Sequence, residues 1–168
     1  MILGGRFLPC SLPCMVDETH ARSLQRLLNQ ADGEWGNIDI WPKQGPTVAT
    51  AGHIFLSSVL SITGTDEAKF ASWTTSESGS LAAAVWTEDL AVLGSRSSAD
   101  DQIVTVVQTR ASLRAIRVLR PPVLSMSGWG VQASPYVAEL VYPEFTAQFR
   151  RRSEEPFLEA LASFKRDL

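Results

Sequence analysis

Apolar side chains recur every three or four residues in two stretches, one near the start of the chain and one at its end. The first stripe runs through Val16, His20, Leu24, Leu27, Leu28 and Ala31, and the second through Phe157, Leu158, Leu161, Phe164 and Leu168. Such spacing places each set on one face of a helix. It predicts amphipathic helices over 16–33, ended by Gly33, and over 154–168.

Between these helices the pattern changes several times. Alternation over 36–42 predicts a short strand, and the apolar, β-branched stretch 47–64 predicts one or two more. A capping residue followed by two acids favours a short helix over 65–73. The stretch 78–94 fits either a helix or a hairpin that turns at Glu88 and Asp89.

Three further segments complete the predicted sheet. Residues 101–109 are apolar on both parities, which is typical of a central strand. Residues 110–123 predict a bend and a strand ended by Pro121 and Pro122. Residues 136–143 predict a strand that carries Tyr136, Ala138, Leu140 and Tyr142 on one face.

Together these elements predict an α+β fold, with a single domain whose mostly antiparallel sheet is flanked by an N-terminal and a C-terminal amphipathic helix. We expect residues 1–15 to form an extended N-terminal arm and residues 16–168 to form the domain. The predicted buried residues are Leu24, Leu27, Leu28, Ile103, Val104, Val106, Leu140, Leu158 and Leu161.

Composition restricts the class of protein. The chain has 168 residues, 45% of them hydrophobic and 20% charged, which excludes a disordered chain and allows a self-supporting core. No apolar run approaches the ~20 residues that span a bilayer, and Arg6 and Pro9 interrupt any signal peptide. The expected location is cytoplasmic or intracellular, with a virion as an alternative, and no membrane partner is expected.

Both cysteines, Cys10 and Cys14, stand in the segment LPCSLPC near the start of the chain. With His20 they could supply three zinc ligands, but no second cysteine pair completes a structural site. Proline holds the residue before it extended, so this segment is better explained as a packed arm with small buried cysteines. We expect neither a metal nor a cofactor.

One arrangement of residues would suit an enzyme. Glu139 lies within the predicted strand 136–143, and Arg6 and Ser57 (or Ser58) precede it in the chain. This order is similar to that of ADP-ribosyl-transferring folds, which place an Arg early, a Ser on a middle strand and an essential Glu on a late strand. The similarity is one of layout without a motif and would imply an NAD-using transferase with Glu139, Ser57 and Arg6 as catalytic residues. The alternative is a solvent-facing Glu139.

Charge is unevenly distributed along the chain. Residues 1–101 hold 6 basic and 12 acidic side chains, whereas residues 102–168 hold 9 basic and 6 acidic ones. Of the 15 basic residues 12 are arginines, which bind carboxylates in a fork and are enriched in interfaces. The candidate partner-binding residues are Arg114, Arg117, Trp129, Arg150, Arg151 and Arg152.

These observations favour a non-catalytic protein whose role is protein contact. It would be a structural subunit of a larger assembly, such as a viral particle component, or an inhibitor or immunity-type protein, and its partners would be other proteins or copies of itself. Two alternatives stay open: the small ADP-ribosyltransferase-like enzyme and an RNA-binding accessory domain. Nucleic acid is the less favoured partner because the chain is acidic overall, with a net charge of −3.

Overall fold

The computed structural model describes residues 18–31, 35, 51–64, 67–77, 80–97, 102–121 and 135–168, with the backbone alone described at 18 and 51–55. The helices in these ranges are α1 (Glu18–Ala31), α2 (Ala51–Thr63) and α3 (Glu154–Phe164), with the short 3-10 helix η2 (Arg110–Ser112). The strands are β1 (Phe70–Thr75), β2 (Leu81–Trp86), β3 (Leu90–Arg96), β4 (Ile103–Thr109), β5 (Ala115–Arg120), β6 (Tyr136–Val141) and β7 (Thr146–Arg151). No helix among them is long and apolar enough to cross a membrane.

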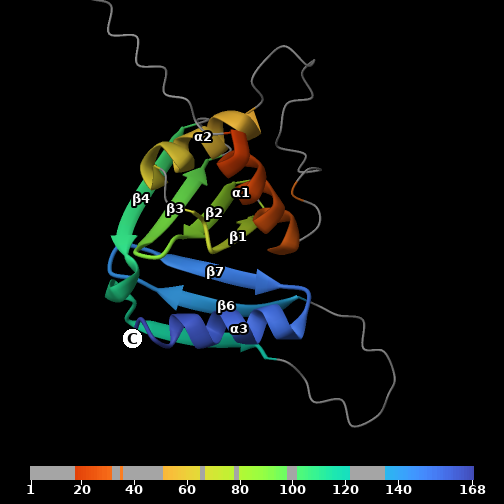
Figure 1. The fold of residues 1–168 in the computed structure, drawn as a ribbon, viewed down its shortest axis with the longest axis vertical. Helices are drawn as coiled ribbons and strands as arrows, with labels where there is room; N and C mark the ends of the chain where they lie inside the picture. The colour runs from red at the N-terminus through yellow and green to blue at the C-terminus, as the bar shows by residue number, and fades with distance from the viewer. Residues whose placement is uncertain are drawn as a thin grey trace, which may run out of the picture.

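The strands form two antiparallel meanders. Sheet A has the order β1-β2-β3-β4 and sheet B the order β5-β6-β7, and each strand pairs with its neighbour in sequence. Figure 1 shows α1 and α2 over sheet A, sheet B beside the β1 edge, and α3 over sheet B. The predicted α+β single domain with a helix at each end is confirmed, with the refinement that the antiparallel strands divide into two sheets.

The middle of sheet A is buried on both faces, and its residues contribute to two separate cores. Ala83 and Val85 point toward α1 and α2, where they join Leu24, Leu28, Val59 and Trp73 in a helix-side core. Ala84 and Trp86 point the other way, toward sheet B and α3, in an inter-sheet core. Since alternate residues of a strand face opposite sides, a strand covered on both sides must be apolar throughout. This requirement explains the sequence LAAAVW of β2.

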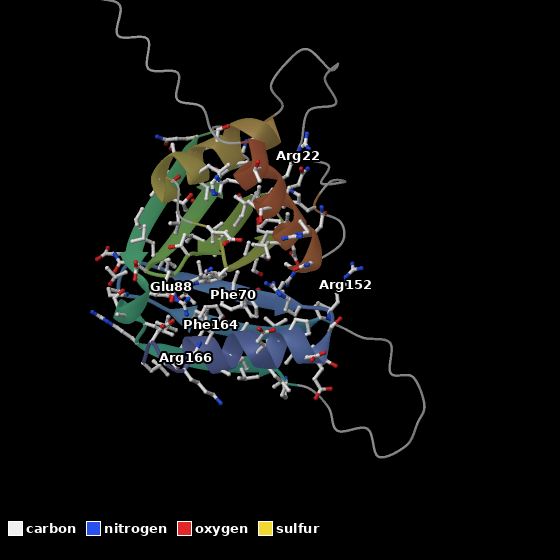
Figure 2. All side chains as sticks on the ribbon, in the orientation of Figure 1. Arg22, Phe70, Glu88, Arg152, Phe164 and Arg166 are labelled. Carbon is white, nitrogen blue, oxygen red and sulfur yellow. The ribbon has the colours of Figure 1, made fainter. Side chains whose placement is uncertain are left out.

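Aromatic rings fill the inter-sheet core. Phe149 of β7 is fully buried, and its ring centroid lies 5.9 Å from that of Trp86, 6.1 Å from Phe157 and 5.3 Å from Phe164. Phe70 of β1 contacts Phe164 of α3 with ring centroids 5.2 Å apart and ring planes tilted by 57°, and Figure 2 labels these two residues close to each other. The rings adopt edge and offset arrangements, which their quadrupoles favour.

The two sheets meet at a seam between β1 and β7 that is held by side chains. Ser72 Oγ accepts a hydrogen bond from the Arg150 N–H at 3.0 Å, and Arg151 Nη1 donates to the Ala71 carbonyl at 2.8 Å. The Arg151 guanidinium also lies 4.3 Å from the ring centroid of Phe149. Arg151 is only 4% exposed, and this burial lowers its pKa to about 10.

A second buried arginine, Arg110 of η2, forms hydrogen bonds both to the C-terminal end of α3 and to the turn after β2 of sheet A. Its Nε and Nη2 both donate to Asp167 Oδ2, at 2.9 and 2.6 Å, and Nη2 also donates to Ser163 Oγ. Its Nη1 donates to the Thr87 carbonyl at 3.1 Å. The guanidinium therefore joins the β2–β3 turn, the β4–β5 corner and the C-terminal helix in one network, which we call the Arg110 clasp.

Several predicted elements agree with the structure. The helices α1 and α3 and the strand β6 form where periodicity places them, and the ambiguous stretch 78–94 is the hairpin β2–β3 with Glu88 and Asp89 at its turn. The bend and strand expected over 110–123 are η2 and β5. The arm expected over 1–15 and the strand expected over 36–42 lie outside the described residues.

Five predictions are wrong. Within 47–64 the described residues form the helix α2 instead of strands, because that apolar stretch packs across sheet A, and the helix expected over 65–73 is replaced by β1. The strand β4 lies at the edge of sheet A and is not central. Val104 and Leu158 are exposed: Val104 is on the edge strand, and Leu158 is on the outer side of α3.

Tyr142 gives the inter-sheet core a measurable dependence on pH. Its hydroxyl accepts a hydrogen bond from Trp86 Nε1 at 3.1 Å, and burial raises its pKa from 10 to about 12. The folded state thus favours the neutral phenol, and this contribution of roughly 2–3 kcal/mol is present below pH 10 and is lost as pH rises from 10 to 12.

We expect Tyr142→Phe to cost about 1–3 kcal/mol near neutral pH, because Trp86 Nε1 loses its partner. That cost should shrink toward zero by pH 12, where only the wild type must ionise a buried phenol. Urea unfolding of both proteins over this range measures the difference, in which the opposite effect of Arg151 cancels. A difference that does not change with pH would contradict the assignment.

Candidate interaction surface

The structure describes two of the three residues that would form a transferase site, Glu139 and Ser57, and it places them on different elements. Glu139 lies on β6, where its Oε2 is 3.9 Å from Arg117 Nη1 of the neighbouring strand. Ser57 lies exposed on the helix α2 and not on a strand, where the layout would place it. Arg6 lies outside the described residues. Glu139 is therefore paired across sheet B and makes no contact with Ser57.

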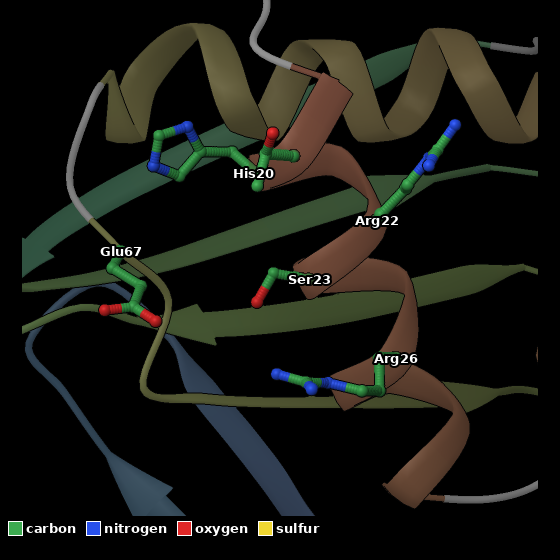
Figure 3. A pocket seen from close by; sticks show the side chains of 6 residues that line it. His20, Arg22, Ser23, Arg26 and Glu67 are labelled. Carbon is green, nitrogen blue, oxygen red and sulfur yellow. The ribbon is translucent and has the colours of Figure 1, made fainter.

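A polar pocket of about 550 Å³ lies between α1 and the segment before β1. Figure 3 shows His20, Ser23 and Arg26 on the side of α1 that faces Glu67, with Arg22 pointing away. A nucleophile needs a base within hydrogen-bond reach. In the described part of the chain no hydrogen bond joins Ser23 to His20 or to Glu67, so the pocket holds no assembled nucleophile and base.

The described residues include no group of side chains that could bind a metal ion. Within the described ranges no three His, Cys, Asp or Glu residues approach as metal ligands. Cys10 and Cys14 lie outside those ranges, so the expectation that they pack without metal stays a prediction. His53 belongs to α2 and not to a strand.

The candidate arginines occupy three different environments. Arg151 is enclosed in the seam, where its guanidinium bonds only to backbone carbonyls in the described structure. Arg150 is partly buried, and its Nε has no hydrogen-bond partner. Arg152 is exposed at the end of β7 and points away from the body of the protein in Figure 2. Arg114 and Arg117 are exposed on and beside β5, and Trp129 lies outside the described residues.

An uncharged surface lies along the β4 edge of sheet A, where Val104 and Val107 point to opposite faces of the strand. The helix α2 and the strand β4 are adjacent, with Ser58 Oγ and Thr105 Oγ1 hydrogen-bonded at 3.0 Å. Together these 13 and 7 residues contain no Asp, Glu, Lys or Arg, although the chain is 20% charged. Val104 is 48% exposed and Val107 is 37% exposed, and Ile62 is also exposed one helical turn after Ser58. We call α2 and β4 the neutral surface.

A cationic surface lies along the outer strand of sheet B. Arg114, Arg117 and Arg120 are exposed over and beside β5, and Val118 and Leu119 between them are 46% and 49% exposed. Within the described residues Glu139 is the acid that approaches these arginines within 4 Å, through Arg117. We call this strand, with Arg114, the cationic edge.

Sequence reasoning identified part of this surface and missed the rest. Arg114 and Arg117 are among the partner-binding residues predicted from the sequence, whereas Arg120 is not. A β-bulge between Val118 and Arg120 changes the parity, so that Arg117 and Arg120 oppose Glu139 and Val137 on the same face of β6. The neutral surface was missed because β4 was expected in the sheet centre. The absence of charged residues from α2 and β4 was the feature of the sequence that could have indicated this surface.

Comparisons of the chain with protein-family models, with curated proteins and with solved structures find no match.

Proposed function

We propose that the protein is a non-catalytic structural subunit that associates with a second copy of itself through the neutral surface. The observation that carries this proposal is the absence of charge from α2 and β4 while Ile62, Val104 and Val107 are exposed. A helix that faces solvent normally carries charged residues on its outer side. At the average of this chain, twenty residues would contain about four charges.

The edge of β4 supports the same proposal. In the described structure β4 pairs with β3 and has no strand on its other side. Natural proteins protect such edges with charged residues, proline or bulges, because an open edge recruits other chains. The sequence IVTVVQT of β4 contains none of these residues, and its register with β3 is regular over seven pairs. An edge of this kind is suited to being covered.

A second copy is the occupant that fits the charge of this surface. Antiparallel pairing of two β4 strands places no like charges opposite each other, because the strand has none. It would join two copies of sheet A into one continuous sheet, with the two α2 helices on the same face. The cationic edge cannot pair with itself in this way, since its arginines would repel one another.

Sedimentation equilibrium of the full chain over a range of concentrations tests the proposal. We expect the wild type to be dimeric and the variant Val104→Lys with Val107→Lys to be monomeric, because lysines on an edge strand oppose its pairing with another strand. The matched control is Val118→Lys with Leu119→Lys, which places the same charges on β5 and should leave the dimer intact. Circular dichroism checks that each variant is folded.

Two results would overturn the proposal. One is a wild type that stays monomeric at the highest concentration tested. The other is a dimer that survives the β4 substitutions but is lost with the β5 substitutions, which would move the interface to sheet B.

A further inference from the structure

The cationic edge differs from the neutral surface in position and in chemistry. It belongs to sheet B, where β5 pairs with β6 and, in the described part of the chain, has no strand along its other side. Its outer backbone groups are therefore placed to accept an added strand. The self-association proposed above uses sheet A, so each idea can fail without the other.

The bulge in β5 gathers positive charge on one face. Residues three apart in a regular strand point to opposite faces, so Arg117 and Arg120 would normally be separated. The extra residue, Leu119, restores the parity and places both arginines on the outer face, opposite Glu139 and Val137 of β6. Arg114 precedes β5 and is exposed beside its start.

These cations are not neutralised inside the described structure. Arg117 has Glu139 at 3.9 Å, a long contact between partly solvated groups that contributes little. Neither Arg114 nor Arg120 has a carboxylate within 4 Å among the described residues. Like charges along one strand destabilise it slightly, and a partner with carboxylates would relieve that repulsion while gaining forked hydrogen bonds.

The cationic edge also exposes apolar side chains, which protection of the strand against pairing does not require. Arginines alone would keep other strands away from β5. Val118 and Leu119, however, are 46% and 49% exposed directly between Arg117 and Arg120. A surface that combines fixed cations with accessible aliphatic side chains matches a partner that combines acids with aliphatic residues.

We propose that the cationic edge binds an acidic, extended peptide segment of another protein, which adds to sheet B as a strand beside β5. Its carboxylates would be two residues apart, because Arg117 and Arg120 oppose residues of β6 that are themselves two apart. The residue between the carboxylates would be aliphatic and would contact Val118 or Leu119. A single strand of nucleic acid fits less well, because Glu139 opposes phosphate and the exposed large apolar residues of the described chain include no aromatic ring for bases to stack on.

Fluorescence anisotropy with the full chain tests this binding mode. The probe is a labelled peptide of about ten residues that alternates Glu with Val, compared with a Lys-Val peptide and a labelled oligouridine of similar length. We expect the Glu-Val peptide to bind most tightly and to weaken as salt is added. Arg117→Glu with Arg120→Glu should reduce its affinity roughly tenfold to a hundredfold.

Two controls separate local recognition from general attraction. Lys165→Glu with Arg166→Glu makes the same change in net charge at the exposed end of α3 and should leave the affinity within about twofold. A Glu-Val peptide methylated on alternate backbone nitrogens keeps its charge but cannot form one edge of a ladder, and it should bind much more weakly. The proposal is overturned if the β5 variant binds the peptide normally, if the methylated peptide binds equally well, or if oligouridine binds more tightly and depends on the same arginines.

Discussion

Replacing Phe149 by alanine is expected to lower the free energy of unfolding by about 3–5 kcal/mol. The ring is fully buried at the centre of the inter-sheet core, in contact with Phe70, Trp86, Phe157 and Phe164. These partners come from β1, β2 and α3, so the cavity would open where three elements meet and where collapse of one neighbour cannot fill it. Chemical denaturation monitored by tryptophan fluorescence measures the change.

The matched control for Phe149 is Leu158→Ala. Leu158 is a large apolar residue of α3 that is exposed, so its truncation should change the free energy of unfolding by less than about 0.5 kcal/mol. A loss of under 1 kcal/mol at Phe149, or similar losses at both positions, would contradict the described packing.

Removal of the arginine from the Arg110 clasp should lower the free energy of unfolding by about as much as Phe149→Ala does. Arg110→Ala deletes four hydrogen bonds and leaves the carboxylate of Asp167 partly buried without its cation. Breaking a buried ion pair from one side typically costs about 3–5 kcal/mol, because the remaining charge is uncompensated. Arg110→Lys should recover little of this loss, since an ammonium group cannot make the forked contact or lie flat near Phe70 and Phe164.

A double-mutant cycle separates the interaction energy between Arg110 and Asp167 from the loss of packing around each side chain. We expect Asp167→Asn to cost less than Arg110→Ala, and the double variant to cost clearly less than the sum of the two. The exposed pair Lys69–Glu67, with 3.6 Å between Nζ and Oε2, is the control: Glu67→Gln should change stability by less than about 0.5 kcal/mol. Additive losses at Arg110 and Asp167 would show that the two residues act independently.

The proposed contacts would together make the protein a bivalent connector. A dimer formed through β4 uses the free edge of sheet A and leaves the β5 edge of each copy available. Two acidic segments on one partner, or on neighbouring partners, could then bind the same dimer. The second binding event would be intramolecular, so the overall affinity could far exceed that of a single segment.

Periodicity predicted the elements whose two sides differ most. The helix α1 has a strongly apolar stripe with polar residues elsewhere, and β6 is a short, mostly apolar run with Glu139 on one face, so both are apparent in the sequence. The helix α2 gave no such signal, because its outer side carries serines and Ile62 in place of charges. Its β-branched content favours a strand locally, and burial against sheet A outweighs that preference.

The edge position of β4 could not be deduced from its composition. Ile103 packs against the helix-side core and Val106 against the inter-sheet core, so both parities are apolar as in a central strand. Unlike a central strand, β4 has no second strand beside it in the described structure, and this leaves Val104 and Val107 exposed. Whether a strand has such a neighbour depends on the strand order of the whole sheet. Likewise, the grouping of Arg117 and Arg120 depends on a bulge whose position is a property of strand pairing and not of local sequence.

The seam between β1 and β7 also sets the order in which the chain can fold. Each meander is made of hairpins between strands that follow one another in sequence, so their closure costs little entropy. The seam hydrogen bonds join residues 78 and 80 positions apart, through Ser72 with Arg150 and Ala71 with Arg151. Such distant contacts become favourable only after the intervening chain is organised. We therefore expect the two meanders to form first and the seam to close last, when α3 packs over the aromatic core.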